Sequence, residues 1–201
     1  MKQSGYSLIE LLVVVAIIGI LAVVLGFEFL GWLTRYQVES QIKTMHADLM
    51  TSFQKAMEKK IQYVVQLPAL NGTGYTICED TNGNNICDAP AETTNSPISK
   101  GLSKSGLRYR LTWNVGGGGA GTSIVMSTRG MIKKWAAGAL TDIDNTSSAT
   151  ILNIWLLNPN TMLPYGITGA NPNNEVDYDC IALSTTRIDI GKYNGAFCAV
   201  K

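Results

Sequence analysis

Hydrophobic and polar positions divide the chain into a long N-terminal helix and a body of short strands. Residues 11–27 form an apolar run that, with its flanks, approaches the roughly 20 residues of a membrane-spanning helix. Beyond it, apolar side chains recur three and four positions apart, as on one face of an amphipathic helix. They are Val38, Ile42, Met45, Leu49, Phe53 and Met57. The pattern predicts one helix from Ser7 to about Tyr63, ending before Pro68, whose second half packs on a globular domain.

The charged positions of this second half mostly fall off the apolar stripe. They are Arg35, Glu39, Lys43, Asp48, Lys55 and Glu58. We expect them to form a solvated surface or a surface that faces a neighbouring subunit.

Alternating side chains predict that the rest of the chain is rich in β-structure. Residues 107–115 alternate strictly between apolar and polar and give the clearest strand. Further strands are predicted at 123–127, 131–135, 150–157 and 180–184, with a terminal hairpin over 179–198. The Gly-rich run 116–121 is expected to be a turn, since it lacks the Lys-Ser/Thr of a phosphate loop, and 158–174 a long surface loop.

These patterns predict an α+β fold built from a helical stem and one domain. The stem covers residues 6–66, with a transmembrane segment at about 8–30, and an antiparallel β-rich globular domain covers 67–201. About 130 residues are enough for one small domain with its own core.

Composition excludes some classes of function. The chain has 201 residues, 15% of them charged, and a net charge of +1, so no overall charge favours nucleic acid as a partner. The one histidine, His46, falls on the stem, where we expect a surface or subunit contact. Catalysis by Ser/His/Asp or Cys/His would have to use it there, so we predict that the protein is not an enzyme.

Between Tyr6 and Glu28, Glu10 is the one charged residue. A charge deep in a bilayer costs about 2.5–3.5 kcal/mol on insertion scales and marks a functional residue that needs a partner. If the chain were cut after Gly5, the new α-amino group of Tyr6 in a neighbouring subunit could pair with Glu10. A simple membrane anchor is the alternative, but it leaves Glu10 unexplained; a secretory signal peptide would be followed by small residues at its cleavage site.

The segment Gly5-Tyr-Ser-Leu-Ile-Glu10, followed by the apolar helix, resembles the class III signal of type IV pilins and type II secretion pseudopilins. The resemblance implies a leader at residues 1–5, cleavage after Gly5 by a prepilin peptidase, and methylation of the Tyr6 amine. It also implies a precursor in the bacterial inner membrane, with its domain outside the cytoplasm. Other pilin or pseudopilin subunits and an inner-membrane assembly platform would then be its partners in building a filament.

A loop rich in Asn and Asp follows in the first part of the domain. Oxygen donors occupy alternate places at Asp80, Asn82, Asn84 and Asp88. With the Ile86 carbonyl, this is the early ligand spacing of a calcium loop, although Asn85 takes the usual glycine place and Ala91 the place of the bidentate carboxylate. The alternative is a hairpin built from Asx turns. The loop also resembles the D-x-N-x-N-x-x-x-D hairpin of GspH/FimT-type minor pilins and pseudopilins, where it joins two early strands.

Four cysteines are compatible with two disulfides in a periplasmic or extracellular domain. Cys78 and Cys87 flank the Asn/Asp loop at a spacing suited to a bridge that would contribute on the order of 3 kcal/mol. Cys180 and Cys198 would bridge the ends of the terminal hairpin, as C-terminal bridges do in pilins. From the sequence, three pairings of four cysteines stay open.

Some members of this family bind DNA through a Gly-Arg-x-Arg turn near the C-terminus. Here the matching positions are Thr186, Arg187, Ile188 and Asp189, so the glycine and the second arginine are missing. Arg187 and Lys192 could still form a small basic patch, but nucleic acid is not the partner we expect. The sequence favours a minor pilin or pseudopilin of GspH/FimT type; the alternatives are a major pilin of the filament shaft and a DNA-binding minor pilin.

Overall fold

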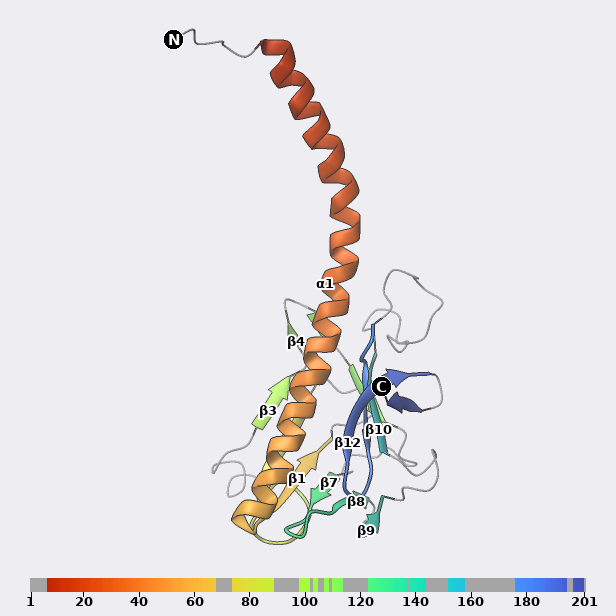
Figure 1. Ribbon diagram of the computed structural model, residues 1–201. Coiled ribbons are helices and arrows are strands. Elements are labelled where there is room, and N and C mark those ends of the chain that lie inside the picture. Colours follow the sequence, from red (N-terminus) through yellow and green to blue (C-terminus); the bar gives the residue numbers. More distant parts are fainter. Residues whose placement is uncertain are drawn as a thin grey trace.

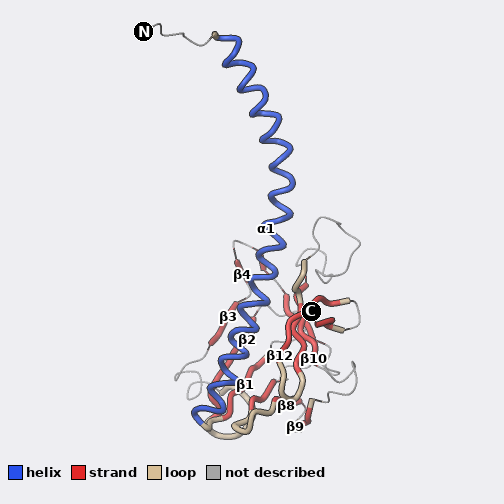
Figure 2. The backbone as a smooth tube through the Cα atoms, in the orientation of Figure 1, coloured by secondary structure: helices blue, strands red, loops and turns tan. Residues whose placement is uncertain are grey.

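A long helix extends from a β-rich body in the computed structural model of the chain (Figures 1 and 2). The N-terminal end lies at the far tip of the helix, and the C-terminal end lies within the body. The structure describes residues 7–67, 74–88, 98–101, 103–104, 107–108, 110–113, 123–136, 138–143, 152–157, 176–194 and 197–200, and within them the side chains except those of 23–34, 98–113, 152–153 and 155–157.

The helix α1 covers Leu8–Lys59, which corresponds to about 80 Å at 1.5 Å per residue. It ends earlier than the predicted Tyr63, because Lys60 adopts left-handed backbone angles (φ 58°, ψ 30°) and the chain turns. The next residues, Gln62–Gln66, form strand β1 inside the range expected for the stem. The β-branched pair Val64 and Val65 favours a strand, and β1 is paired along both edges.

β1 lies in the middle of an antiparallel sheet of six strands in the order β3-β2-β1-β7-β8-β9. The other strands are β2 (Gly74–Asp80), β3 (Ile98–Gly101), β7 (Ser123–Met126), β8 (Ile132–Ala136) and β9 (Ala139–Asp142). The register places Val64 opposite Cys78 of β2 and Val125 of β7.

A second antiparallel sheet has five strands in the order β13-β12-β11-β10-β6. They are β6 (Arg110–Trp113), β10 (Leu152–Leu157), β11 (Cys180–Leu183), β12 (Ile188–Tyr193) and β13 (Cys198–Val200). Two further short strands, β4 (Ser103–Lys104) and β5 (Leu107–Arg108), pair with each other. The single strand predicted over 107–115 was therefore wrong, since its parts belong to β5 and β6 in different sheets; the expected turn at 116–121 and loop at 158–174 lie outside the described residues.

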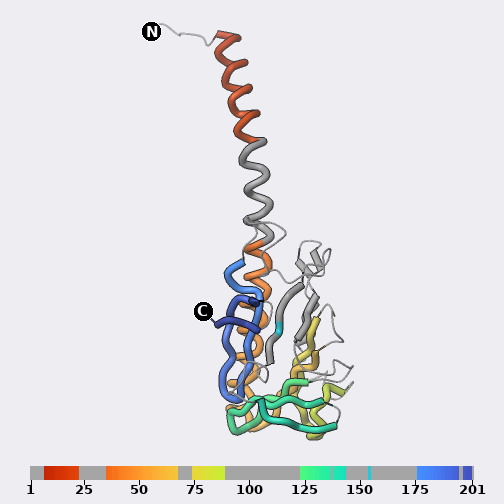
Figure 3. The backbone as a smooth tube through the Cα atoms, turned by 90° about the vertical axis from the view of Figure 1, so that its right-hand side faces the viewer, coloured from red at the N-terminus to blue at the C-terminus, as the bar shows by residue number. Residues whose placement is uncertain are grey.

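The second half of α1 runs beside strands of both sheets, as Figure 3 shows, and the three share one core. Val38, Ile42, Met45 and Leu49 are buried, which confirms this part of the predicted stripe, whereas Phe53 is partly buried and packs against the core. The sheets contribute side chains from both sides: Val65, Ile77, Ile124, Met126, Ile132, Ile154, Ile181, Leu183 and Ile188 among others.

Both predicted disulfides are present, and each lies on the face of its sheet that is turned away from the central core. Cys78–Cys87 joins β2 to the Asn/Asp loop, and Cys78 packs with Val64 and Val125. Cys180–Cys198 joins β11 to β13 in a separate small cluster. Next to it, β12 and β13 approach so closely at Gly191 that an added Cβ would lie 2.1 Å from the Ala199 carbonyl oxygen.

Candidate functional site

The helix begins directly after the predicted processing point. Gly5 and Tyr6 lie outside the described residues, and Ser7, in extended backbone geometry, precedes the first helical turn. The Ser7 carbonyl accepts the Glu10 N–H at 3.1 Å and the Leu11 N–H at 3.3 Å. Glu10 therefore lies in the first turn, where the positive end of the helix dipole favours a carboxylate.

The first half of α1 presents bare apolar side chains. Leu8, Ile9, Leu11 and Leu12 expose 83, 69, 65 and 61% of their surface, and the apolar residues up to Leu21 are exposed as well. Glu10 is also exposed among them. Isolated exposed apolar residues are ordinary, but a contiguous patch marks an interaction site.

Wherever side chains are described, no helical stretch is long and apolar enough to cross a membrane. The transmembrane segment at residues 8–30 stays a prediction.

Polar contacts fix the middle of α1 to the globular domain. Arg35 forms ion pairs with Glu39, at 3.3 Å, and with Asp177, whose backbone N–H donates to the same Glu39 oxygen at 3.0 Å. Lys43 lies 3.7 Å from the other Glu39 oxygen, and its Nζ is 5.2 Å from the centre of the Tyr178 ring. The prediction of a solvated or subunit-facing surface was wrong for Glu39, whose side chain is 15% exposed, because residues 177 and 178 return to cover it.

Two further contacts from the same helix reach opposite sheets. The buried Tyr75 hydroxyl of β2 donates to Asp48 at 2.7 Å; burial, together with this carboxylate, raises the pKa of Tyr75. The His46 Nε2 lies 3.0 Å from the Ile188 carbonyl oxygen of β12. His46 and Asp48 therefore both contact the globular domain, although Asp48 stays partly exposed beside the contact with Tyr75.

The end of α1 is fastened by a buried carboxylate. Lys59 donates to Glu79 at 2.6 Å, and the Tyr63 hydroxyl donates to the same oxygen. These hydrogen bonds, that of Lys59 first, lower the pKa of Glu79 and keep it charged. Burial, reinforced by the Glu79 hydrogen bond, raises the pKa of Tyr63, so helix, β1 and β2 meet at one charged group.

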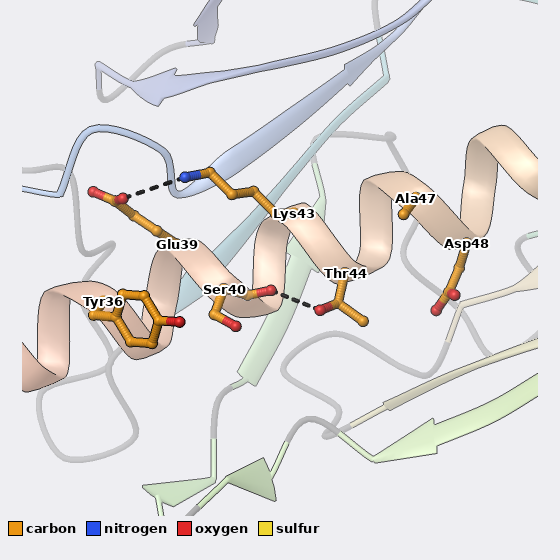
Figure 4. A pocket seen from close by; sticks show the side chains of 7 residues that line it. All are labelled: Tyr36, Glu39, Ser40, Lys43, Thr44, Ala47 and Asp48. Atoms are coloured by element: carbon orange, nitrogen blue, oxygen red, sulfur yellow. Dashed lines mark hydrogen bonds and ion pairs between the residues drawn. The ribbon is translucent and has the colours of Figure 1, made fainter.

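An open groove of about 540 Å³ follows α1 on its exposed side (Figure 4). It is lined by Tyr36, Glu39, Ser40, Lys43, Thr44, Ala47 and Asp48. In Figure 4 the Lys43 ammonium points to Glu39, and the Thr44 hydroxyl donates to the Ser40 carbonyl at 2.8 Å. These two contacts join neighbouring turns of the helix, and the groove offers a surface for contact with another molecule.

Asp80 organises the Asn/Asp loop from inside. One of its oxygens accepts the Gly83 N–H at 2.6 Å, and the other accepts the Asn85 N–H at 3.0 Å and the side-chain amide of Gln62 at 2.7 Å. Asp80 is 5% exposed. Its carboxylate thus caps the loop against β1.

The other predicted calcium ligands form Asx turns. The Asn82 side-chain oxygen accepts the Asn84 N–H and the Asn84 oxygen accepts the Ile86 N–H, both at 2.9 Å. Asp88 accepts the side-chain amides of Asn82 and Asn84. Asx turns are therefore present in the loop, as the alternative to a calcium loop predicts. Over the described ranges no group of three or more His, Cys, Asp or Glu side chains is placed to hold a metal ion, and calcium binding stays a prediction.

The two residues of the predicted basic patch lie apart. Arg187, 71% exposed, is in the turn before β12 and forms an ion pair with Asp189 at 3.3 Å. Lys192 lies opposite Ala199 of β13, separated from that turn by about 13 Å of strand at 3.3 Å per residue. DNA binding by this pair stays the alternative that the sequence does not favour.

Comparison with known proteins gives one match. The family model of the prokaryotic N-terminal methylation motif matches residues 1–26. The chain carries this methylation motif. The match supports the type IV pilin and pseudopilin superfamily, whose subunits are processed by prepilin peptidase, and it does not extend to the globular domain. No curated protein and no solved structure matches the chain.

The methylation motif contains Gly5, Tyr6 and Glu10 but none of the groups that join the stem to the domain. Reasoning from the sequence missed Glu39, Asp48 and Glu79 as such groups. Their partners Asp177 and Tyr75 are distant in sequence, so no local pattern could have shown them. The β-branched pair next to Tyr63 was the available signal that the helix ends earlier.

Proposed function

We propose that this protein is a minor pilin or pseudopilin, a structural subunit of a type IV pilus or a type II secretion pseudopilus. The observation that carries the proposal is the continuity between the methylation motif at residues 1–26 and a helix that leaves its apolar side chains bare. Its second half is already packed on its own domain. The first half is therefore the part that is left for other molecules.

The bare half of the helix needs an apolar environment. Fully burying a Val, Leu or Ile side chain is worth about 1.5–3 kcal/mol, and eleven such side chains are exposed between Leu8 and Leu21 in a chain taken by itself. Lipid would cover them in the inner-membrane precursor, and the matching helices of neighbouring subunits would cover them in a filament. The two disulfides fit a domain outside the cytoplasm, where disulfides persist.

Glu10 would set how deeply a subunit enters the filament. A charge in this apolar surface needs a partner once lipid or helices surround it. Cleavage after Gly5 creates an amine at Tyr6, and in a neighbouring subunit that amine would face Glu10. This ion pair would favour one axial offset between adjacent helices over all other offsets.

Mass spectrometry of sheared extracellular filaments tests the proposal. We expect a chain that begins at methylated Tyr6 and is scarce beside another, dominant pilin. Dominance of this chain would instead make it a major pilin. A chain that still begins at Met1 in cells that process other prepilins would refute the filament function.

Glu10→Gln tests the assembly step separately from processing. The variant should be cleaved after Gly5 and yet be lost from filaments, because the neighbour's amine would have no carboxylate. Glu58→Gln is the matched control, since Glu58 is an exposed carboxylate on the same helix, close to its end. Equal recovery of both variants in filaments would contradict the proposed pairing.

A further inference from the structure

We propose that Asn82 and Gly83 form a self-modifying site, at which Asn82 is converted to aspartate or isoaspartate through a cyclic imide. The backbone nitrogen of the residue after an asparagine can attack the side-chain amide, and glycine obstructs this attack least. Both residues are exposed in the Asn/Asp loop, and the space where a Cβ of Gly83 would lie is open. The loop supplies a base, a donor to the attacked amide and a contact that orients this amide.

The first group is a base at the nucleophile. The Gly83 nitrogen donates its hydrogen to an Asp80 oxygen at 2.6 Å. Asp80 is held in place by the Gln62 side-chain amide at 2.7 Å and the Asn85 N–H at 3.0 Å, both on its other oxygen. A positioned carboxylate within hydrogen-bond reach of the proton to be removed meets the geometric requirement for a general base.

The second group polarises the amide that is attacked. The Asn84 N–H donates to the side-chain oxygen of Asn82 at 2.9 Å. As the nitrogen adds to the Asn82 Cγ, negative charge develops on this oxygen, and a fixed backbone N–H stabilises it. The same Asx turn restrains the rotation of the Asn82 side chain.

The third group holds the leaving amide. The Asn82 Nδ2 donates to an Asp88 oxygen at 3.3 Å. This contact orients the Cγ–Nδ2 bond that must break. The Cys78–Cys87 disulfide closes the chain around the loop, so nucleophile, base and leaving group are ordered before reaction, which lowers the entropic barrier.

The steps balance without any oxidant or cofactor. A bond forms between the Gly83 nitrogen and the Asn82 Cγ as Asp80 takes the proton from that nitrogen, the Cγ–Nδ2 bond breaks, and the amide nitrogen leaves as ammonia with a proton from water, while Asp80 returns its proton to water. Water then opens the imide. Cleavage between the Gly83 nitrogen and Cγ gives aspartate, and cleavage at the backbone carbonyl of residue 82 gives isoaspartate. Either product adds a negative charge to the loop.

The chain contains its own internal controls. Asn71-Gly72 and Asn194-Gly195 are the same dipeptide elsewhere in the sequence. Full-length protein in detergent would be aged at neutral pH, either folded with its disulfides intact or reduced and unfolded in denaturant. Peptide mapping by mass spectrometry with electron-transfer fragmentation would then follow aspartate and isoaspartate at all three sites.

We expect conversion at Asn82 to be at least about tenfold faster in the folded protein than in the unfolded one, because a general base contributes only when it is positioned. The three sites should react at similar rates once unfolded. An equal or slower rate at Asn82 in the folded protein would overturn the proposal and show that the hydrogen bonds protect the site.

Asp80→Asn should reduce the folded-state rate at Asn82 to the unfolded level. Asp142→Asn is the matched control, since Asp142 is an exposed carboxylate on β9 outside the loop, and it should leave the rate unchanged. An unchanged rate in Asp80→Asn with the Cys78–Cys87 bridge intact would refute the role of Asp80. The comparison of folded with unfolded wild-type protein needs no variant and decides the proposal even if this one fails to fold.

Discussion

Replacing Leu49 by alanine should destabilise the globular domain, whereas the same replacement at Leu12 should leave its stability unchanged. Both leucines lie on α1, so helix propensity changes equally in the two variants. Leu49 is fully buried in the core shared by the helix and both sheets. Leu12 is 61% exposed in the half of the helix that precedes the domain.

The difference in stability follows from burial. A Leu→Ala change at a fully buried position costs about 2.7–5.0 kcal/mol, from lost transfer energy and from the cavity left behind. Leu49 packs between elements of both sheets, which limits collapse into the cavity, so we expect about 3–4 kcal/mol. At Leu12 the removed carbons already contact solvent or detergent, and we expect less than about 1 kcal/mol.

Urea denaturation of full-length protein in detergent measures this difference. Trp135 packs against the Val64 and Cys78 cluster, so tryptophan fluorescence includes a signal from the folded domain. The midpoint should fall markedly in Leu49→Ala with an unchanged slope and stay at the wild-type value in Leu12→Ala. A similar loss in both variants, or none in Leu49→Ala, would refute the division of the helix into a packed half and a bare half.

Three substitutions and one calcium titration test the contacts of the domain. Tyr63→Phe removes a buried hydroxyl that donates to the charged Glu79 and should cost about 1–2 kcal/mol in urea denaturation. Because the pKa of Glu79 is lowered in the folded state, its charge stabilises the domain above pH 4.5, and this stabilisation is lost as the pH falls below that value. The melting temperature of Glu79→Gln should therefore fall less between neutral and acid pH than that of wild type. Gly191→Ala would place a Cβ against the Ala199 carbonyl. Relative to wild type, amide hydrogen exchange should accelerate in β13, whereas the exchange rates in β9 should stay the same. Calcium titration should raise the melting temperature if loop 80–88 binds the ion, and no shift at millimolar calcium would contradict that prediction.

Local patterns in the sequence were enough for elements whose signal is local. The stripe from Val38 to Leu49 follows the helical period, and its members are buried together. The strands β7, β8, β10 and β11 were predicted within a residue or two, because short segments rich in β-branched, aromatic and other apolar residues lie there between turn signals. Neither signal depends on which distant segment packs against the element.

Pairing between distant segments was not predictable in the same way. β1 is a strand because β2 and β7 hydrogen bond to its two edges. The helical stripe immediately before it instead led to the prediction that the helix continues to about Tyr63. The strict alternation over 107–115 could not show that its parts join different sheets. In the sequence, Glu39 and Asp48 have the pattern of solvated helix positions. Their contacts with Asp177 and Tyr75 form only in the folded domain, from segments distant in the chain.

The anchoring contacts on α1 also explain why its bare half can serve assembly. From Arg35 to Lys59 the helix is held by ion pairs, by hydrogen bonds to both sheets and by a buried stripe. The helix of this subunit is therefore fixed to its own globular domain. A neighbouring subunit that bound residues 8–21 would position that domain together with the helix. The methylation motif lies at the end of the helix farthest from the domain, so under the proposed function the pairing of one charged residue there, Glu10, would determine where the whole domain stands in a filament.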